Sequence, residues 1–142
     1  MATEHNRIEV QMQNHRWLFY GLAGAVDHFA ERAGLSEAGR RDLVEAVDQA
    51  CGNTFPLLAG EDDSLRITIE DFIDRLEVTL EYHGEPLPAA GLETFAALGD
   101  EEGAPGDLTG LALMARVDRV LYDTQGNTSR MTLVKNSPPA RK

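Results

Sequence analysis

Apolar and polar positions alternate in five short stretches of the chain, which is the pattern of a strand with one buried face. The first stretch is residues 7–13, where Ile8, Val10 and Met12 share one side. The next two are residues 65–69 and 76–82, and the short link at 72–74 predicts that they form an antiparallel hairpin. Residues 120–124 and 128–135 predict a second hairpin across residues 125–127.

Two segments repeat apolar residues at steps of three and four, which predicts amphipathic helices. The first helix is expected over residues 15–33, and Gly34 suits the position that closes it. Ser36 is a favourable N-cap for the second helix, whose buried face is predicted to include Leu43, Val47, Ala50 and Thr54. Pro56 is expected to end that helix because proline lacks a backbone donor.

The predicted order is strand, two helices, hairpin, long loop, short helix and hairpin. This order favours an α/β two-layer sandwich, in which a mixed, mostly antiparallel sheet carries its helices on one face. We expect one domain over residues 1–136 and a flexible tail over 137–142. Residues 89–107 are rich in glycine, alanine, proline and acids, which is typical of a loop or lid, and a short helix is expected over 109–117.

Composition narrows the classes of function. The 142 residues carry a net charge of −11, which argues against binding to nucleic acids or anionic membranes. No apolar run reaches the roughly 20 residues of a membrane span, and the N-terminus lacks the pattern of a signal peptide. A lone cysteine, Cys51, suits a reducing compartment. We therefore expect a cytoplasmic protein, and its acidic charge permits a basic protein partner.

Residues 42–53, DLVEAVDQACGN, hold the most informative polar pair of the chain. Gln49 and Asn53 are four residues apart, so a helix places both amides on one face. An asparagine there can ligate Mg²⁺. The position one turn earlier suits a catalytic carboxylate, but it holds an amide.

Three segments in the same order resemble the anti-sigma-factor serine kinases of bacteria, a branch of the GHKL ATPase superfamily. AGLSEAGRRDLVEAVDQACGN is similar to the helix that ends in that family's acid-x-x-x-Asn box. LEVTLEYHGEPLP resembles the strand and turn with an Asp-x-Gly motif, and LTGLALMARVDRVLYDTQGNTSRMTLVK resembles the lid end and final hairpin. The resemblance covers nearly the whole chain and implies the Bergerat, histidine-kinase-like ATPase fold.

The resemblance also implies roles for individual positions. Asn53 would coordinate the Mg²⁺ that bridges the phosphates of ATP, whereas Gln49 stands where the family has its catalytic carboxylate. An amide can orient a nucleophile but cannot accept its proton.

The positions that bind adenine and phosphate in the family also hold different residues in this chain. Tyr82 replaces the adenine-binding aspartate, while Gly84 of that motif is retained. Leu108 replaces the first glycine of the lid motif, and Gly110 is the second. Leu108 should weaken the approach of backbone amides to phosphate. The simplest interpretation of Tyr82 is a core residue, and adenine contact is its alternative.

Three functions are compatible with these departures. The first is a regulatory pseudo-kinase that works by protein–protein binding in a partner-switching circuit, with weak or absent ATP binding. Its partner would be a sigma factor or an anti-anti-sigma factor, and a homodimer is implied by analogy. The second is an active, Mg²⁺- and ATP-dependent serine/threonine kinase of an anti-anti-sigma factor, since positioning supplies much of phosphoryl transfer. The third is a small-molecule sensor that has reused the nucleotide pocket.

Consecutive aromatic residues on the first helix indicate a further contact surface. Trp17, Phe19 and Tyr20 cannot all face the core, because neighbours on a helix diverge by about 100°. We expect at least one of them to be exposed. Exposed aromatics are frequent in protein interfaces, and the alternative is a ring that only covers the edge of the sheet.

Overall fold

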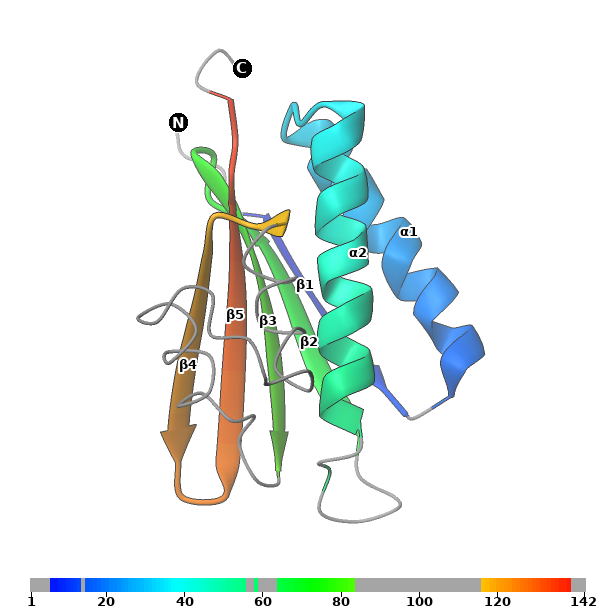
Figure 1. Cartoon of the computed structure of the whole chain (residues 1–142), viewed down its shortest axis with the longest axis vertical. Helices are drawn as coiled ribbons and strands as arrows, with labels where there is room; N and C mark the ends of the chain where they lie inside the picture. Colours follow the sequence, from blue (N-terminus) through cyan, green and yellow to red (C-terminus); the bar gives the residue numbers. More distant parts are fainter. Residues whose placement is uncertain (1–5, 14, 56–57, 59–63, 84–115, 139–142) are drawn as a thin grey trace, which may run out of the picture.

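The computed structural model describes residues 6–13, 15–55, 58, 64–83 and 116–138. Within them, five strands form one sheet and two α-helices lie side by side on one of its faces (Figure 1). The elements are, in order, β1 (Asn6–Met12), a short 3₁₀ turn (Arg16–Leu18), α1 (Phe19–Arg32), α2 (Glu37–Thr54), β2 (Leu65–Asp71), β3 (Arg75–His83), β4 (Arg119–Gln125) and β5 (Thr128–Asn136). The α/β two-layer architecture is therefore as predicted.

The prediction of a mixed sheet is wrong for the described strands, because every adjacent pair is antiparallel. The strand order is β1-β2-β3-β5-β4. The physical reason lies in the connection from β1 to β2. It contains two helices, so the chain passes the sheet twice and returns to the end from which it left. Met12 at the end of β1 consequently pairs with Leu65 at the start of β2.

The helix boundaries follow local sequence signals with one exception. Ser36 caps α2 as predicted, since its Oγ accepts the N–H of Gly39 at 3.0 Å. Gly34 adopts a φ of +86°, which glycine tolerates without strain. The first helix begins later than predicted, because a 3₁₀ turn precedes α1 and Leu18 stands at its N-cap without a side-chain hydrogen bond.

The core lies between the helices and the sheet. Strand β3 alternates strictly, with Leu76, Val78 and Leu80 fully buried toward the helices and the residues between them turned outward. Helix α2 contributes Leu43, Val47 and Ala50 to the same core, as expected from its periodicity. Apolar burial of this kind stabilises a domain by roughly 25 cal/mol per Å².

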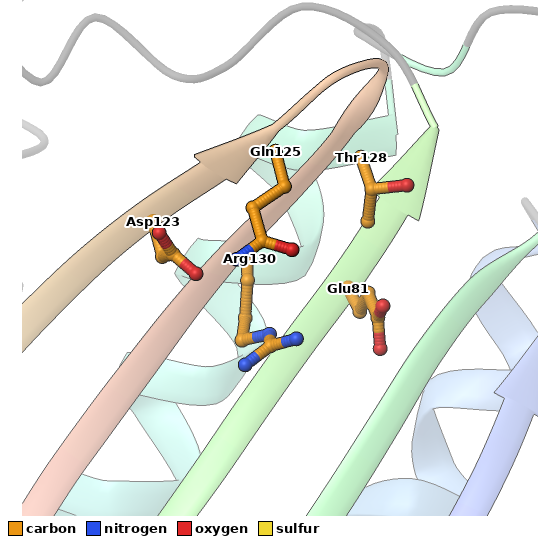
Figure 2. Close-up of a pocket in the computed structure, with 5 residues that line it drawn as sticks. All are labelled: Glu81, Asp123, Gln125, Thr128 and Arg130. Carbon is orange, nitrogen blue, oxygen red and sulfur yellow. The ribbon is translucent and has the colours of Figure 1, made fainter.

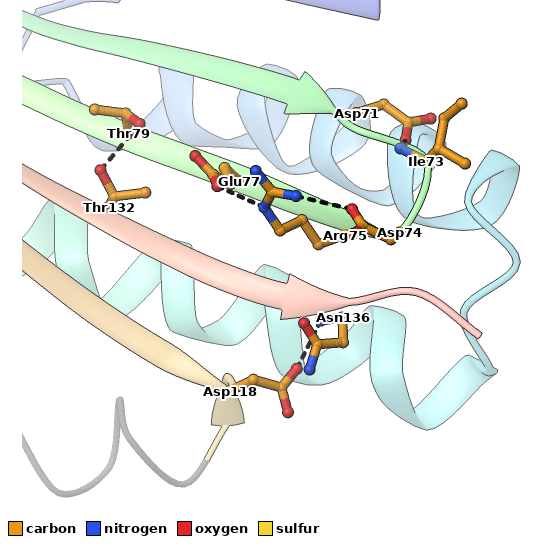
Figure 3. A network of polar contacts seen from close by, with 9 residues as sticks. All are labelled: Asp71, Ile73, Asp74, Arg75, Glu77, Thr79, Asp118, Thr132 and Asn136. Atoms are coloured by element: carbon orange, nitrogen blue, oxygen red, sulfur yellow. Dashed lines mark hydrogen bonds and ion pairs between the residues drawn. The ribbon is translucent and has the colours of Figure 1, made fainter. Parts of the chain in front are cut away.

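Both hairpins form where the sequence predicts them. Between β4 and β5, Gly126 has a φ of +61°, which suits the first central residue of a two-residue turn. Between β2 and β3, Ile73 has a φ of +79° and the N–H of Asp74 bonds the carbonyl of Phe72 at 2.9 Å. This is a γ-turn with a β-branched residue at its centre, a strained arrangement. Figure 3 shows this turn beside Arg75, which contacts Asp74 and Glu77.

None of the described helices is both long and apolar enough to cross a membrane.

Candidate functional site

The predicted polar pair lies on a longer polar stripe of α2. The stripe runs along one side of the helix at steps of three and four residues: Asp42, Glu45, Gln49 and Asn53. Gln49 and Asn53 are both half-buried, so the helix places the two predicted amides on a shared, partly enclosed face. Their neighbour Ala50 faces the core and its carbonyl accepts the hydroxyl of Thr54 at 2.6 Å.

Arg116, which precedes β4, joins this stripe to the sheet. Its Nη1 lies 2.8 Å from Oε1 of Glu45 and 3.6 Å from Oδ1 of Asp42. The carbonyl of Arg116 accepts a hydrogen bond from Nζ of Lys135 on β5 at 2.9 Å. Residues far apart in the sequence thus meet at one end of the stripe. The sequence interpretation missed Arg116. The available signal was the pair of acids Asp42 and Glu45, which lie three residues apart on one face of the helix and attract a cationic side chain.

Two buried polar atoms, one on the stripe and one on the adjoining Arg116, have no hydrogen-bond partner among the residues that the structure describes. They are Oε1 of Gln49, which is an acceptor, and Nε of Arg116, which is a donor. Buried polar atoms are nearly always paired, so such atoms call for an explanation. Oε1 of Gln49 is therefore free to receive a hydrogen bond from a hydroxyl or a water. It can orient such a group, but an amide does not remove its proton.

The donor set at Gln49 and Asn53 fits Mg²⁺ only in part. Mg²⁺ in phosphate-binding sites is held through one or two carboxylates together with the substrate's phosphates. The two predicted positions supply neutral amides, and the nearby carboxylates of Asp42 and Glu45 are engaged by Arg116. The described residues contain no group of three or more His, Cys, Asp or Glu side chains placed to hold a metal ion.

Tyr82 belongs to the core. It is the last helix-facing residue of β3, pairs in register with Ser129, and is only 3% exposed. The interpretation of Tyr82 as a core residue is the one that its burial favours. The phenol interacts electrostatically with Tyr122 on β4. Burial first, and Tyr82 second, raise the pKa of Tyr122 to about 12. This end of the core is thus aromatic, where the resemblance expects a carboxylate for adenine.

Several predicted positions lie outside the described residues. They are Gly84, the loop 89–107, Leu108, Gly110 and most of the short helix expected over 109–117. The roles that the resemblance implies for Gly84 and Gly110 therefore stay predictions.

A polar pocket lies on the opposite face of the sheet, away from the helices. It has a volume of about 130 Å³ and is lined by Glu81, Asp123, Gln125, Thr128 and Arg130 (Figure 2). Next to it, Arg66 lies 3.1 Å from Glu9 and 3.8 Å from Glu81. Arg66 thus bridges Glu9 and Glu81 on the two neighbouring strands, and we interpret this face as a solvated surface on which opposite charges face each other across strands.

The prediction that at least one aromatic residue near the start of the first helix is exposed is confirmed. Trp17 is 69% exposed and Tyr20 is 73% exposed, whereas Phe19 between them is buried in the core. The two exposed rings lie three residues apart, so they share one side of the chain where it enters α1.

Comparison with known proteins gives no match, either to a protein-family model or to a protein of curated function.

Proposed function

We propose that the protein is a regulatory binding protein of the anti-sigma-factor kinase type, which holds its partner by surface contacts and without a requirement for ATP. The partner class implied by the resemblance is a sigma factor or an anti-anti-sigma factor. The observation that carries the proposal is the exposure of Trp17 and Tyr20 at 69% and 73%. Tryptophan and tyrosine are the residues most enriched among the binding hot spots of protein interfaces.

The α2 stripe supports the second half of the proposal, which concerns ATP. Gln49 and Asn53 offer two neutral amides, and the end of β3 offers a buried phenol in place of a carboxylate. A pocket with these groups lacks the carboxylate base for phosphoryl transfer, and it holds a bulky phenol where the resemblance expects the carboxylate that accepts the adenine amino group. Both departures weaken a kinase, while neither affects binding through α1.

The alternative is an active Mg²⁺- and ATP-dependent serine/threonine kinase. One observation favours it, namely the unpaired Oε1 of Gln49, which can orient a substrate hydroxyl. Positioning without a strong base still supports slow phosphoryl transfer.

Co-expression of the chain with each sigma factor and small antagonist protein of its own genome tests the proposal. We expect one of them to co-purify as a stable complex from nucleotide-free buffer. The double variant Trp17→Ala/Tyr20→Ala should lose that complex. Leu121→Ala is the matched control, because Leu121 is an exposed hydrophobic residue on the other face of the sheet.

Two results would contradict the proposal. One is a complex that forms only after Mg²⁺ and ATP are added. The other is the absence of a complex with any sigma factor or antagonist, together with phosphate transfer to one of them.

A further inference from the structure

Strand β4 (Arg119–Gln125) is an open edge of the sheet. It stands at one end of the strand order β1-β2-β3-β5-β4, and among the described strands only β5 pairs with it (Figure 1). Five of its seven residues are exposed. It contains no proline and no lysine, and its register with β5 runs without a bulge, so it lacks three features that often block an edge strand. This edge can therefore pair with a further strand.

The backbone groups at this edge belong to alternate residues of β4. Gln125 and Thr128 face each other across the two-residue turn, and such a turn is closed by a hydrogen bond between its first and fourth residues. Alternation along an antiparallel strand then directs the N–H and C=O groups of Val120, Tyr122 and Thr124 away from β5. A strand that pairs with the edge would bond to these three residues.

Two charged side chains of β4 are left without a partner. Arg119 and Asp123 are exposed, and among the described residues neither makes an ion pair. They lie on the sheet face turned away from the helices, since Val120 and Tyr122 between them pack against the core. Leu121 lies midway between the two charges on that face and is 44% exposed. The strand thus presents a cation, an apolar residue and an anion at even spacing.

The other edge strand, β1, does not present free charges in this way. Arg7 lies 3.8 Å from Glu70, and Glu9 lies 3.1 Å from Arg66, so the neighbouring strand β2 already engages both charges. A strand that docks on β1 would compete with these contacts. Charge complementarity therefore favours β4 as the edge at which a second strand docks.

We propose that the protein forms a symmetric dimer in which the β4 edges of two copies pair in antiparallel and join the two sheets. The two-fold axis passes through the position of Leu121, so each Leu121 covers its counterpart. Arg119 of each copy then lies opposite Asp123 of the other copy, and Val120 lies opposite Tyr122. Opposite charges and apolar side chains that face each other across strands stabilise a sheet.

Neighbouring registers do not give this match. An axis at Tyr122 places Leu121 opposite Asp123, and an axis at Val120 places Arg119 opposite Leu121. Both registers set a charge against an apolar side chain and leave the second charge unpaired. The pattern of side chains along β4 therefore selects the axis at Leu121.

The dimer contact is independent of the proposed binding function. β1 and β4 are opposite edges of the sheet, and α1, which carries Tyr20 next to Trp17, packs against β2 (Figure 1). A single paired edge is a small contact, and interfaces that bury less than about 1,200 Å² are typically weak. We therefore expect a reversible dimer with a Kd of about 10–100 μM.

Sedimentation equilibrium of the full chain, at concentrations from about 1 μM to 1 mM, measures this association. We expect a monomer–dimer equilibrium without larger species, because a two-fold contact is closed. Amide hydrogen exchange at low and high protein concentration locates the contact. Val120 and Tyr122 should gain protection as the dimer forms, whereas Ile8 and Val10 of β1 should not.

Charge reversal tests the register. Arg119→Asp sets carboxylates against each other and Asp123→Arg sets guanidinium groups against each other, so each variant should raise the Kd by about tenfold or more. A mixture of these two single variants should form a heterodimer about as tightly as the wild type, because each carboxylate then meets a guanidinium group. The double variant Arg119→Asp/Asp123→Arg should likewise restore the homodimer. Arg7→Asp, which reverses a charge on the other edge strand, is the matched control and should leave the Kd unchanged.

The proposal is overturned if the chain stays monomeric up to about 1 mM, or if association protects the amides of β1 and not those of β4. It is also overturned if the two single variants, each with the native circular dichroism spectrum, fail to associate when mixed. Trp17→Ala/Tyr20→Ala should retain the dimer, so failure of the dimer and failure of the proposed partner complex are distinguishable.

Discussion

The carboxylate of Asp71 accepts the backbone N–H of Ile73 at 2.9 Å, and this bond holds an isoleucine at a φ of +79°. Among the described residues Ile73 is the only one other than glycine with positive φ. A β-branched side chain in that region is strained by about 1–3 kcal/mol. The turn between β2 and β3 is therefore strained at Ile73, and the hydrogen bond from its N–H to Asp71 stabilises it.

Replacement of Ile73 by glycine should raise the free energy of unfolding by about 0.5–1 kcal/mol. Relief of the strain outweighs the loss of a side chain that is already 42% exposed. The measurement is urea denaturation. Ile8→Gly is the matched control, because Ile8 is 37% exposed but lies in β1 without positive φ. It should lower the stability, and a loss for both variants would contradict the assignment of strain to Ile73.

Replacement of Asp71 by alanine should lower the free energy of unfolding by about 1–3 kcal/mol, because the N–H of Ile73 then lacks its acceptor. Asp71→Asn retains a carbonyl oxygen as acceptor, so it should lower the free energy of unfolding by less. Hydrogen exchange at the amide of Ile73 is the direct measurement. Equal protection of this amide in the wild type and Asp71→Ala would show that the bond is not what holds the turn.

Replacement of Gly24 by alanine should raise the free energy of unfolding by about 1 kcal/mol. Gly24 lies inside α1, and a Cβ atom there would meet nothing within 4 Å. Alanine is the better helix former by about that amount. Gly126→Ala also meets no neighbour but has a φ of +61°, so it should be destabilising. Because neither position offers a steric obstacle to a Cβ atom, a difference in Tm between the two variants reports on backbone conformation alone.

Tyr122 should make the protein sensitive to alkaline pH. Its pKa rises from 10.0 to about 12 in the folded state, mainly through burial. The neutral phenol is favoured by folding, so the stabilisation is fully present below pH 10 and is lost as the pH approaches 12. Since the side chain is only partly buried, solvent screening reduces the effect to about 1 kcal/mol.

The Tyr122→Phe variant isolates this contribution. The difference in unfolding free energy between wild type and variant should change across that pH range, and the tyrosinate ultraviolet absorbance should titrate late in the wild type. A pH-independent difference would contradict the assignment.

Most of the fold can be predicted from hydrophobic periodicity and from the residues that favour turns and helix caps. Ser36, Gly34 and the alternation of β3 act through neighbours in the sequence, so their consequences are local and predictable. The all-antiparallel sheet was not predicted, because strand direction depends on how the helix pair returns the chain. Arg116 was missed for a related reason, as its partners Asp42 and Glu45 lie far away in the sequence. The strain at Ile73 contradicts its β-forming propensity and is visible only in three dimensions.

Titration with Mg²⁺ and ATP tests the central claim, which is that the protein works by binding and without nucleotide. A ligand at 100 times its Kd stabilises the folded state by about 2.7 kcal/mol. For a chain of this length that raises the Tm by roughly 5–10 °C. We expect no saturable change in Tm with Mg²⁺ and ATP at about 1 mM, a concentration at which a Kd of about 10 μM would produce the full shift. A saturable rise that requires both Mg²⁺ and ATP, and that is lost in Asn53→Ala, would contradict it.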